Sequence, residues 1–403
     1  MEVNKQMIKN EVNNIFRTSG MPNATYVVRE NGRYENEIED ALLAHGKVCI
    51  ITGASKTGKT SLYTKVLSDN HLTAIKLRGG SDTRNDYYAQ IQSAINGRTN
   101  NEDPKNMIDL MKEKSKVLVI EDFQYFNDEN KKLIAMLCKE FVDEMMTVIV
   151  VTTAHRVADI TEIRPDLMGR VSHVDVQSWR SDDLKEIAQL GFNKLEITID
   201  DDIIDLIASE SVGLPIITQS VCQRMVIGGL KDCSTLKEML LTEIDVRKAL
   251  NLTAIQDYIH FEKILKIFNR LLKDYEYQLW SKVVSAFMED PIEFSLNVEQ
   301  LRDRMERVDT HDDPGMHAVP VDTGALVTQM GLMPELKRQK PPLIEWVAET
   351  EELHIIEPTF LFYIRWKKPR TKISPVTQKS IEILKALRSY PRQRNQENVR
   401  EIV

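Results

Sequence analysis

Short apolar runs alternate with helix-like stretches along the first half of the chain. Four of these runs have the length and β-branched composition of buried strands, near 48–52, 117–120, 147–152 and 171–176. The stretches with helical character lie near 58–68, 84–96, 105–114 and 128–143. This alternation predicts an α/β fold in which helices cover both faces of a parallel sheet, and ligands bind at the carboxyl ends of the strands.

The pattern then becomes mainly helical, and it divides the chain into six segments. Residues 1–20 predict an amphipathic helix, 21–180 the α/β core, 181–245 a helical lid, 246–274 connecting helices, 275–370 a C-terminal module and 371–403 a tail. Within the module we expect helices near 276–289, 297–307 and 319–332, then strands at 342–347 and 353–356. In the tail, Pro375 precedes a helix predicted from about 376 to 387.

The first apolar run leads into a glycine-rich loop, Gly53-Ala-Ser-Lys-Thr-Gly58-Lys59-Thr60, and then into a helix. A strand, loop and helix in this order direct backbone N–H groups and a helix N-terminus at one point, which favours phosphate. Lys59 would supply a positive charge to the β- and γ-phosphates, and Thr60 a hydroxyl to Mg²⁺. The predicted cofactors are therefore ATP and Mg²⁺. The predicted binding residues are Gly53, Ser55, Lys56, Thr57, Gly58, Lys59, Thr60 and Ser61.

The second apolar run ends in two carboxylates, Glu121 and Asp122. Both are candidates for the magnesium shell and for catalysis, together with Thr60 as a metal ligand. If Glu121 holds the magnesium, Asp122 orients or deprotonates the attacking water. If Asp122 holds it, Phe123 follows and no base is evident, so hydrolysis would be slow.

Hydroxyl groups end the third apolar run, at Thr152 and Thr153. A hydroxyl at this strand end can sense the γ-phosphate or position water. We expect Thr152 to have this role, with Thr153 as the alternative.

Together these motifs resemble the AAA+ and STAND ATPases, the signal-transducing branch of P-loop proteins. Residues 25–29, with 35–38 after them, are similar to the pre-strand segment that flanks adenine in that family. Residues 169–191 are similar to the end of its core and the start of its lid, and Gly213-Leu214-Pro215 to its G-x-P motif. Residues 357–366 resemble the segment that closes the winged helix of archaeal-type relatives. The family order of the two acids is Asp then Glu, which is reversed here.

The resemblance implies roles for three further residues. Arg29 and Pro215 would lie near the base, although Arg29 equally suits packing and Pro215 equally suits the first turn of a helix. Arg170 would reach the nucleotide of a neighbouring subunit, with Arg156 as the rival. The family also implies a homo-oligomer and a C-terminal winged helix.

Charge and composition restrict the class of protein. No apolar run reaches the roughly 18 residues of a membrane span, and the four cysteines lack metal-ligand spacing, so we expect a cytoplasmic protein with reduced thiols. Residues 365–403 carry 11 Lys and Arg against 3 Asp and Glu, whereas the remainder has a net charge of −16. A basic tail on an acidic body suits either a nucleic-acid contact or a solvated segment.

Three functions follow from these patterns. The first is an ATP-dependent switch that changes conformation or oligomerises with nucleotide and relays a signal to a separate effector protein, a role that includes antiviral defence in the resembling class. The second is a DNA-associated AAA+ regulator or loader that uses the winged helix and basic tail. The third is a nucleotide-locked scaffold that barely turns over ATP.

Overall fold

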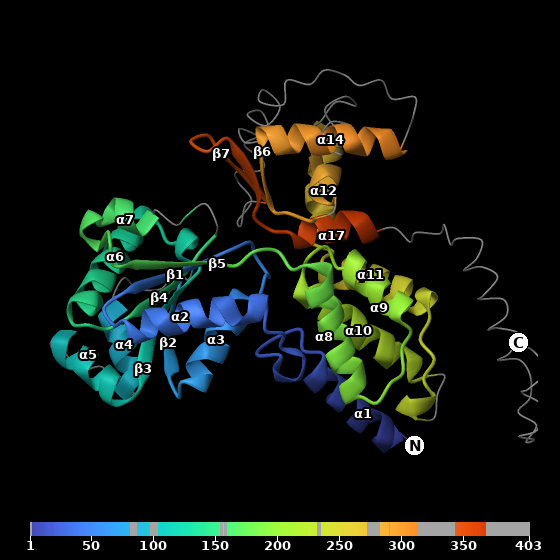
Figure 1. Cartoon of the computed structure of the whole chain (residues 1–403), viewed down its shortest axis with the longest axis horizontal. Helices are drawn as coiled ribbons and strands as arrows, with labels where there is room; N and C mark the ends of the chain where they lie inside the picture. Colours follow the sequence, from blue (N-terminus) through green and yellow to red (C-terminus); the bar gives the residue numbers. More distant parts are fainter. Residues whose placement is uncertain are drawn as a thin grey trace, which may run out of the picture.

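The computed structural model describes residues 2–80, 87–96, 104–153, 156, 159–231, 235–271, 283–289, 291–312 and 343–367. They form an α/β core, a helical domain over the residues of the predicted lid, for which the name lid is kept below, and a C-terminal domain that stands above both (Figure 1). Within these residues, no helix combines the length and apolar character needed to cross a bilayer. The basic tail and its predicted helix lie outside the described residues, as does the helix expected at 319–332.

Five parallel strands make the core sheet, in the order β2-β3-β4-β1-β5. The strands are β1 (Val48–Thr52), β2 (Thr73–Arg78), β3 (Lys116–Glu121), β4 (Val148–Val151) and β5 (Val171–Asp175). The predicted α/β class is confirmed, but β2 was missed. It is an edge strand with alternating exposed residues, including Lys76 and Arg78, so it lacks the continuous apolar run of the buried strands.

Helices cover both faces of this sheet because successive strand residues point to opposite sides. The helices are α2 (Arg33–Leu43), α3 (Lys59–Asp69), α4 (Tyr87–Asn96), α5 (Pro104–Glu113), α6 (Asp128–Asp143) and α7 (Asp159–Ile163). Cys49 and Ile51 of β1 pack with α2 and α3, whereas Val48 and Ile50 pack on the face of α4, α5 and α6. In the segment similar to the family's pre-strand segment, residues 26–29 belong to no helix or strand, and a 3₁₀ helix (Glu30–Gly32) separates them from α2.

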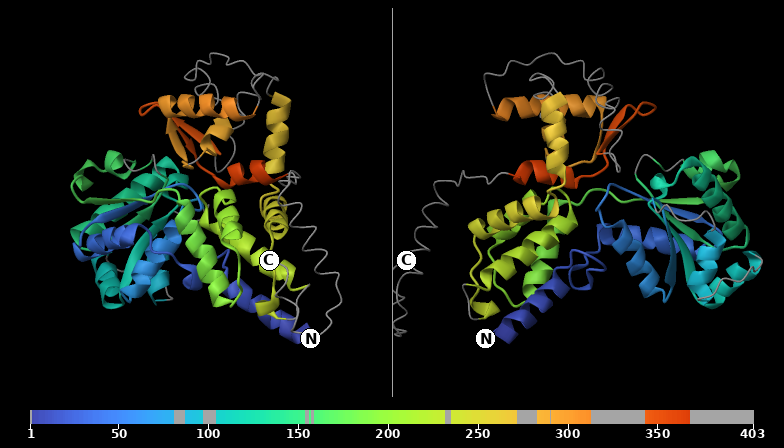
Figure 2. Two further views of the ribbon diagram at one scale, coloured as in Figure 1. Left: turned by 45° about the vertical axis from the view of Figure 1, so that its right-hand side comes forward. Right: turned by 180° about the vertical axis from the view of Figure 1, so that it is seen from behind.

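The lid contains α8 (Ser181–Lys194), α9 (Asp201–Glu210), α10 (Pro215–Gly229) and α11 (Glu243–Asp257). The N-terminal helix α1 (Glu2–Ile15) lies against it, as the views in Figure 2 show. Phe16 stacks edge-on against Phe192, with ring centroids 5.3 Å apart, and any side chain at Gly191 would overlap its ring. The N-terminal helix is therefore part of the apolar core of the lid.

The C-terminal domain has a three-stranded antiparallel sheet in the order β6-β8-β7. Its elements are α12 (Phe261–Leu271), β6 (Ser295–Asn297), α14 (Val298–Asp312), β7 (Ile344–Val347), β8 (Glu352–Ile355) and α17 (Thr359–Trp366), with a helical turn at 283–287. Strand β6 was not predicted. Helix α17 joins this domain to the lid, because Arg365 forms a bidentate ion pair with Glu210 of α9.

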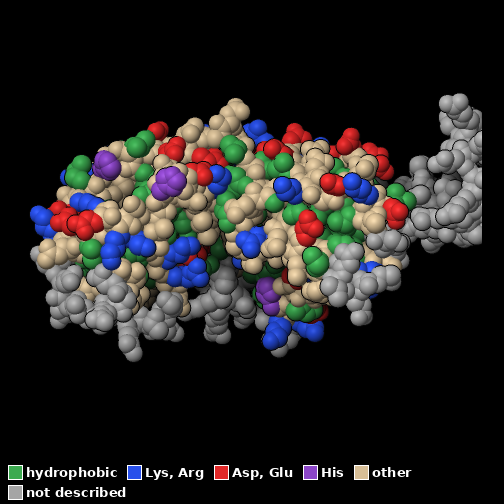
Figure 3. Space-filling view, turned by 90° about the horizontal axis from the view of Figure 1, so that it is seen from below, with side chains coloured by type: hydrophobic (Ala, Val, Ile, Leu, Met, Phe, Trp, Pro, Cys, Tyr) green, Lys and Arg blue, Asp and Glu red, His purple; other side chains and the backbone are tan. Residues whose placement is uncertain are grey.

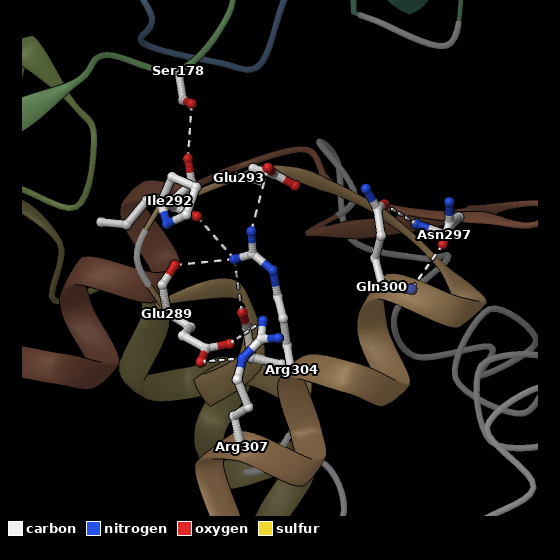
Figure 4. Close-up of polar contacts among 10 residues, drawn as sticks. Ser178, Glu289, Ile292, Glu293, Asn297, Gln300, Arg304 and Arg307 are labelled. Carbon is white, nitrogen blue, oxygen red and sulfur yellow. Dashed lines mark hydrogen bonds and ion pairs between the residues drawn. The ribbon is translucent and has the colours of Figure 1, made fainter.

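A buried arginine organises the loop before β6 (Figure 4). The Arg304 side chain is only 7% exposed, and its Nη1 donates to the carbonyl oxygens of Glu289 at 3.0 Å and Pro291 at 2.9 Å. The same loop reaches the core–lid linker, where Ser178 Oγ donates to the carbonyl oxygen of Ile292 at 2.8 Å. Arg304 thus fixes a loop that braces the connection between the other two parts.

Candidate functional site

A cavity of about 640 Å³ lies between the core and the lid, at the carboxyl ends of the strands. Register places the key residues at this edge, because Ile51 of β1 pairs with Val151 of β4, and Val150 pairs with Ile120 of β3. The cavity is lined by the glycine-rich loop, the ends of β3 and β4, the segment before α2 and the first turns of α10. This volume is that of a typical small-molecule site.

The glycine-rich loop has a backbone that only glycine fits at its first position. Gly53 has φ 142°, and a Cβ there would lie 2.5 Å from the carbonyl oxygen of Val176. Gly58 has φ 96° and provides no side-chain cap for α3, so the first N–H groups of that helix remain available to an anion. The loop is held from the lid side by Trp179, whose Nε1 donates to the carbonyl oxygen of Thr57 at 2.8 Å.

Residues 55–62 line the cavity, which brings together every predicted loop residue except Gly53. Lys59 lies at its floor, and its Nζ donates to the carbonyl oxygens of Gly53 and Ala54, both at 2.7 Å. Burial lowers the pKa of Lys59 to about 8, although the negative charges of Asp122 and Glu357 act to raise it. A buried ammonium with incomplete charge compensation suits a phosphate partner.

The two carboxylates at the end of β3 have different surroundings. Glu121 is buried and accepts hydrogen bonds from Tyr63 and from Arg78 Nη2, both at 2.5 Å, with Lys76 Nζ 3.5 Å away. Burial alone would raise the pKa of Glu121, but the hydrogen bonds from Tyr63 and Arg78 and the nearby positive charges hold it below its ordinary value. Glu121 is therefore an ionised residue that ties α3 to β2.

Asp122, in contrast, has no side-chain hydrogen bond or ion pair within the described part of the chain, and it lines the cavity. Burial and the charge of Glu121 raise its pKa, while Arg78, Lys59 and Lys56 oppose this shift. The residue has φ 56°, and a Cβ on Gly79 would lie 2.2 Å from its carbonyl oxygen. Asp122 is the acid of the pair that remains available to a ligand.

The two threonines after β4 also differ. Thr152 Oγ1 donates to Gln124 Oε1 at 3.2 Å, whereas Thr153 Oγ1 is buried and has no partner among the described residues. Both line the cavity. A buried hydroxyl without a partner is costly, so Thr153 suits a ligand oxygen better than Thr152, which was the expected choice.

Arg29 and Pro215 both line the cavity. Arg29 donates to the carbonyl oxygens of Gln177 at 3.1 Å and Ser178 at 2.9 Å, and its guanidinium lies 4.7 Å from the ring centroid of Trp179. Arg29 therefore fastens the segment before α2 to the core–lid linker. Pro215 is the first residue of α10.

The two candidate trans-acting arginines are not cavity residues. Arg170 directly precedes β5, at the amino ends of the strands, whereas the loop lies at their carboxyl ends. Its side chain pairs with Asp143 at 2.9 Å. Arg156 donates to Glu345 of β7 at 2.5 Å and so connects the core with the C-terminal domain. A role for Arg170 in a neighbouring subunit stays a prediction.

Sequence reasoning missed one residue at the loop, Glu357, which follows β8 in the C-terminal domain. Its Oε2 accepts a hydrogen bond from Ser55 Oγ at 3.1 Å, and the main-chain N–H of Ser55 donates to the carbonyl oxygen of Ile356 at 3.4 Å. No local motif marks this contact, because the residues meet only through the domain arrangement. A carboxylate of the C-terminal domain thus contacts the glycine-rich loop.

The described residues contain no group of three or more His, Cys, Asp and Glu able to hold a metal ion. A magnesium ion at this site would therefore take one or two protein ligands, with phosphate oxygens and water completing its shell, as is usual for Mg²⁺. Thr60 and Asp122, which both line the cavity, fit that requirement.

Comparison with known proteins agrees with this geometry. Residues 43–160 match the AAA domain family. This match spans the glycine-rich loop, the acid pair and the end of β4, so this part of the core is similar to an AAA domain. No curated protein matches the chain.

Solved structures with similar folds share little sequence with this chain. The Walker-type ATPase PABY2304 of Pyrococcus abyssi is 14% identical, with a TM-score of 0.49, over 87% of this chain and 99% of that one. Cdc6p from Pyrobaculum aerophilum is 12% identical, with a TM-score of 0.46, over 88% and 98% of the two chains. A chain of Drosophila ORC bound to DNA is 14% identical, with a TM-score of 0.45, over 89% and 90%.

Proposed function

We propose that this chain is an ATP-binding and ATP-hydrolysing switch, in which nucleotide at the glycine-rich loop controls the docking of the C-terminal domain. The observation that carries the proposal is the contact of Ser55 with Glu357, because it couples the loop directly to that domain. ATP would supply the phosphoanhydride bond and Mg²⁺ the charge that stabilises its phosphates. A ligand that binds one domain arrangement more tightly shifts the population toward it.

In this proposal each residue has a defined task. The amides of residues 55–61 and the ammonium of Lys59 bind the β- and γ-phosphates, and Thr60 faces the magnesium. Asp122 holds the magnesium shell or orients water, and the hydroxyl of Thr153 donates to the γ-phosphate. Glu121 positions Arg78 and Tyr63 behind them.

The wider role is a relay. We propose that ATP changes the oligomeric state, with Arg170 reaching the nucleotide of a neighbouring copy, and that the assembled protein acts on a separate effector, as in the defence-related members of the resembling class. The C-terminal domain would be a winged helix, supported by its three-stranded antiparallel sheet with α14 between β6 and β7.

Calorimetric titration with ADP and with a non-hydrolysable ATP analogue in Mg²⁺ tests the binding step. The expected result is one site per chain, weakened about 10-fold to 150-fold by Lys59→Ala, since hydrogen bonds to charged groups contribute about 1.5–3 kcal/mol. Lys65→Ala, an exposed change on the same helix, should leave binding unchanged. Equal affinity for all three proteins would reject the proposal. Mass measurement in both nucleotides tests assembly.

A DNA-associated regulator is the second candidate, favoured by the net charge of +8 in residues 365–403. The face seen in Figure 3 mixes Lys and Arg with Asp and Glu and offers no extended basic surface. Titration with duplex DNA at several salt concentrations separates the two functions. Tight binding that weakens steeply with salt supports the DNA role.

A further inference from the structure

The wall of the cavity formed by the lid and by the segment before α2 has the character of a nucleobase site. Its walls include the apolar side chains of Val27, Ile187, Pro215 and Ile216. If the phosphates bind the loop, the base of the same nucleotide lies toward α10. A flat apolar slot accepts any base, so the choice among bases depends on polar groups in its wall.

One such group is the side-chain amide of Gln219, which is 3% exposed and lines the cavity one turn after Pro215. Its Nε2 donates to Thr25 Oγ1 at 2.6 Å. The Thr25 hydroxyl in turn donates to the carbonyl oxygen of Ile15 at 3.3 Å, so its oxygen accepts from the amide. This chain of donors fixes the orientation of the amide and leaves Oε1 of Gln219 as a buried acceptor with no partner among the described residues.

We propose that Gln219 is the residue that selects adenine nucleotides, by accepting a hydrogen bond from the 6-amino group of the purine. An acceptor at this position favours a base that carries a donor. A 6-oxopurine such as guanine or hypoxanthine would place its carbonyl oxygen against Oε1, leaving two acceptors facing each other. The inference rests on the proposed function, since it concerns the base of the nucleotide held at the loop.

A purely structural role explains the amide less well. Gln219 already makes its structural bond through Nε2, and a buried acceptor without a partner is costly unless a ligand satisfies it. The next turn of the same helix provides a comparison. Gln223 Nε2 donates to the carbonyl oxygen of Phe16 at 2.9 Å, and Gln223 is not among the residues that line the cavity. Gln223→Leu is therefore the matched control for Gln219→Leu.

The test measures affinity for three diphosphates that differ only at position 6 of the purine: ADP, IDP and purine riboside 5′-diphosphate, which has no substituent there. The wild-type protein should bind ADP about tenfold more tightly than purine riboside diphosphate, the factor of one neutral hydrogen bond, and IDP most weakly. Gln219→Leu should lower ADP affinity to that of purine riboside diphosphate and raise IDP affinity toward the same value, because the acceptor that repels the 6-carbonyl oxygen is gone. Gln223→Leu should keep the wild-type order.

The two levels of the proposal fail separately. Pyrophosphate binding reports the loop alone and should be equal in all three proteins. If neither pyrophosphate nor any nucleotide binds to the wild-type protein, the proposed function is wrong. If ADP binds but wild-type affinity for IDP is equal or higher, or if Gln219→Leu keeps the discrimination, the role of Gln219 is wrong. The affinities of the wild-type protein for the three diphosphates test the role of Gln219 even if a variant does not fold.

Discussion

Ser55 of the glycine-rich loop donates a 3.1 Å hydrogen bond to Glu357, a residue 302 positions away in the C-terminal domain. The negative charge of Glu357 also acts to raise the pKa of Lys59, against the larger effect of burial, so the two groups interact electrostatically. Phosphate groups would meet the same lysine and the same loop. Glu357 and a bound polyphosphate are both negatively charged and would both lie near Lys59, so they should repel each other.

This repulsion predicts the effect of Glu357→Gln. Removing one negative charge beside the phosphates should tighten ADP binding about threefold to tenfold, the size expected for a unit charge at short range in a partly solvated site. Glu345→Gln is the control, because Glu345 also connects the C-terminal domain to the core, but through Arg156 rather than through Ser55 of the glycine-rich loop. Calorimetry measures both. Weaker ADP binding in Glu357→Gln would mean that the contact assists the nucleotide.

The lowered pKa of Lys59 predicts a pH dependence. The folded-state value is about 8, against roughly 10.4 for an unfolded lysine, so between these values the folded protein holds fewer protons. The stability of the unliganded protein should therefore rise with pH across this window. A bound phosphate stabilises the protonated, positively charged form of Lys59. The affinity for ADP should therefore fall above about pH 8, by at most about tenfold per pH unit.

Titrations of ADP between pH 7 and 9.5 measure this slope. Lys59→Arg keeps its charge over the whole range and should show a flat profile. A wild-type profile that is equally flat would mean that Lys59 does not titrate at the site.

The acid pair should separate into a structural and a catalytic residue. Glu121→Gln removes the charge that Arg78 and Lys76 share, and we expect a loss of about 1–3 kcal/mol in the free energy of unfolding. Asp122→Asn should leave stability nearly unchanged, because burial already disfavours its charged form. It should slow phosphate release about 100-fold or more, as expected when a general base or metal ligand is lost. If Asp122→Asn hydrolyses ATP as fast as the wild-type protein, Glu121 would be the catalytic acid instead.

Thr152 and Thr153 give a matched pair of isosteric substitutions. Thr152→Val deletes the bond to Gln124 and should lower the free energy of unfolding by about 1 kcal/mol. Thr153→Val removes a hydroxyl without a partner and should leave stability equal or higher. Only Thr153→Val should weaken the binding of the ATP analogue relative to the binding of ADP, by about fivefold. The reverse assignment would support Thr152 as the γ-phosphate sensor. Thermal denaturation and calorimetry provide the two measurements.

Arg304 and Arg307 lie one turn apart and test the brace between domains (Figure 4). Arg304→Met leaves the carbonyl oxygens of the loop before β6 without their buried donor, so we expect a loss of about 2–4 kcal/mol in the free energy of unfolding. Arg307→Met removes an exposed pair with Glu289 and should cost under about 1 kcal/mol. Chemical denaturation compares them, and equal effects would contradict the bracing role of Arg304.

Much of the core could be predicted because its elements carry local signals. Strands β1, β3, β4 and β5 are apolar runs bounded by polar residues, and the glycine-rich loop is a motif whose chemistry follows from its spacing. Strand β2 was not predicted because an edge strand keeps polar residues on its exposed side. Residues 25–29, which resemble a pre-strand segment, make hydrogen bonds with the linker after β5 and with the lid.

The sequence alone determined the phosphate-binding loop, the acid pair and the parallel sheet that brings them to one edge, because these depend on local backbone torsions and on the periodicity of apolar residues. Only the tertiary structure decided which acid is free, which threonine lacks a partner, that Glu357 contacts the glycine-rich loop, and that Gln219 lines the cavity. Pairing and burial are properties of residues distant in sequence, and they arise when packing excludes water from groups that a linear pattern leaves equivalent.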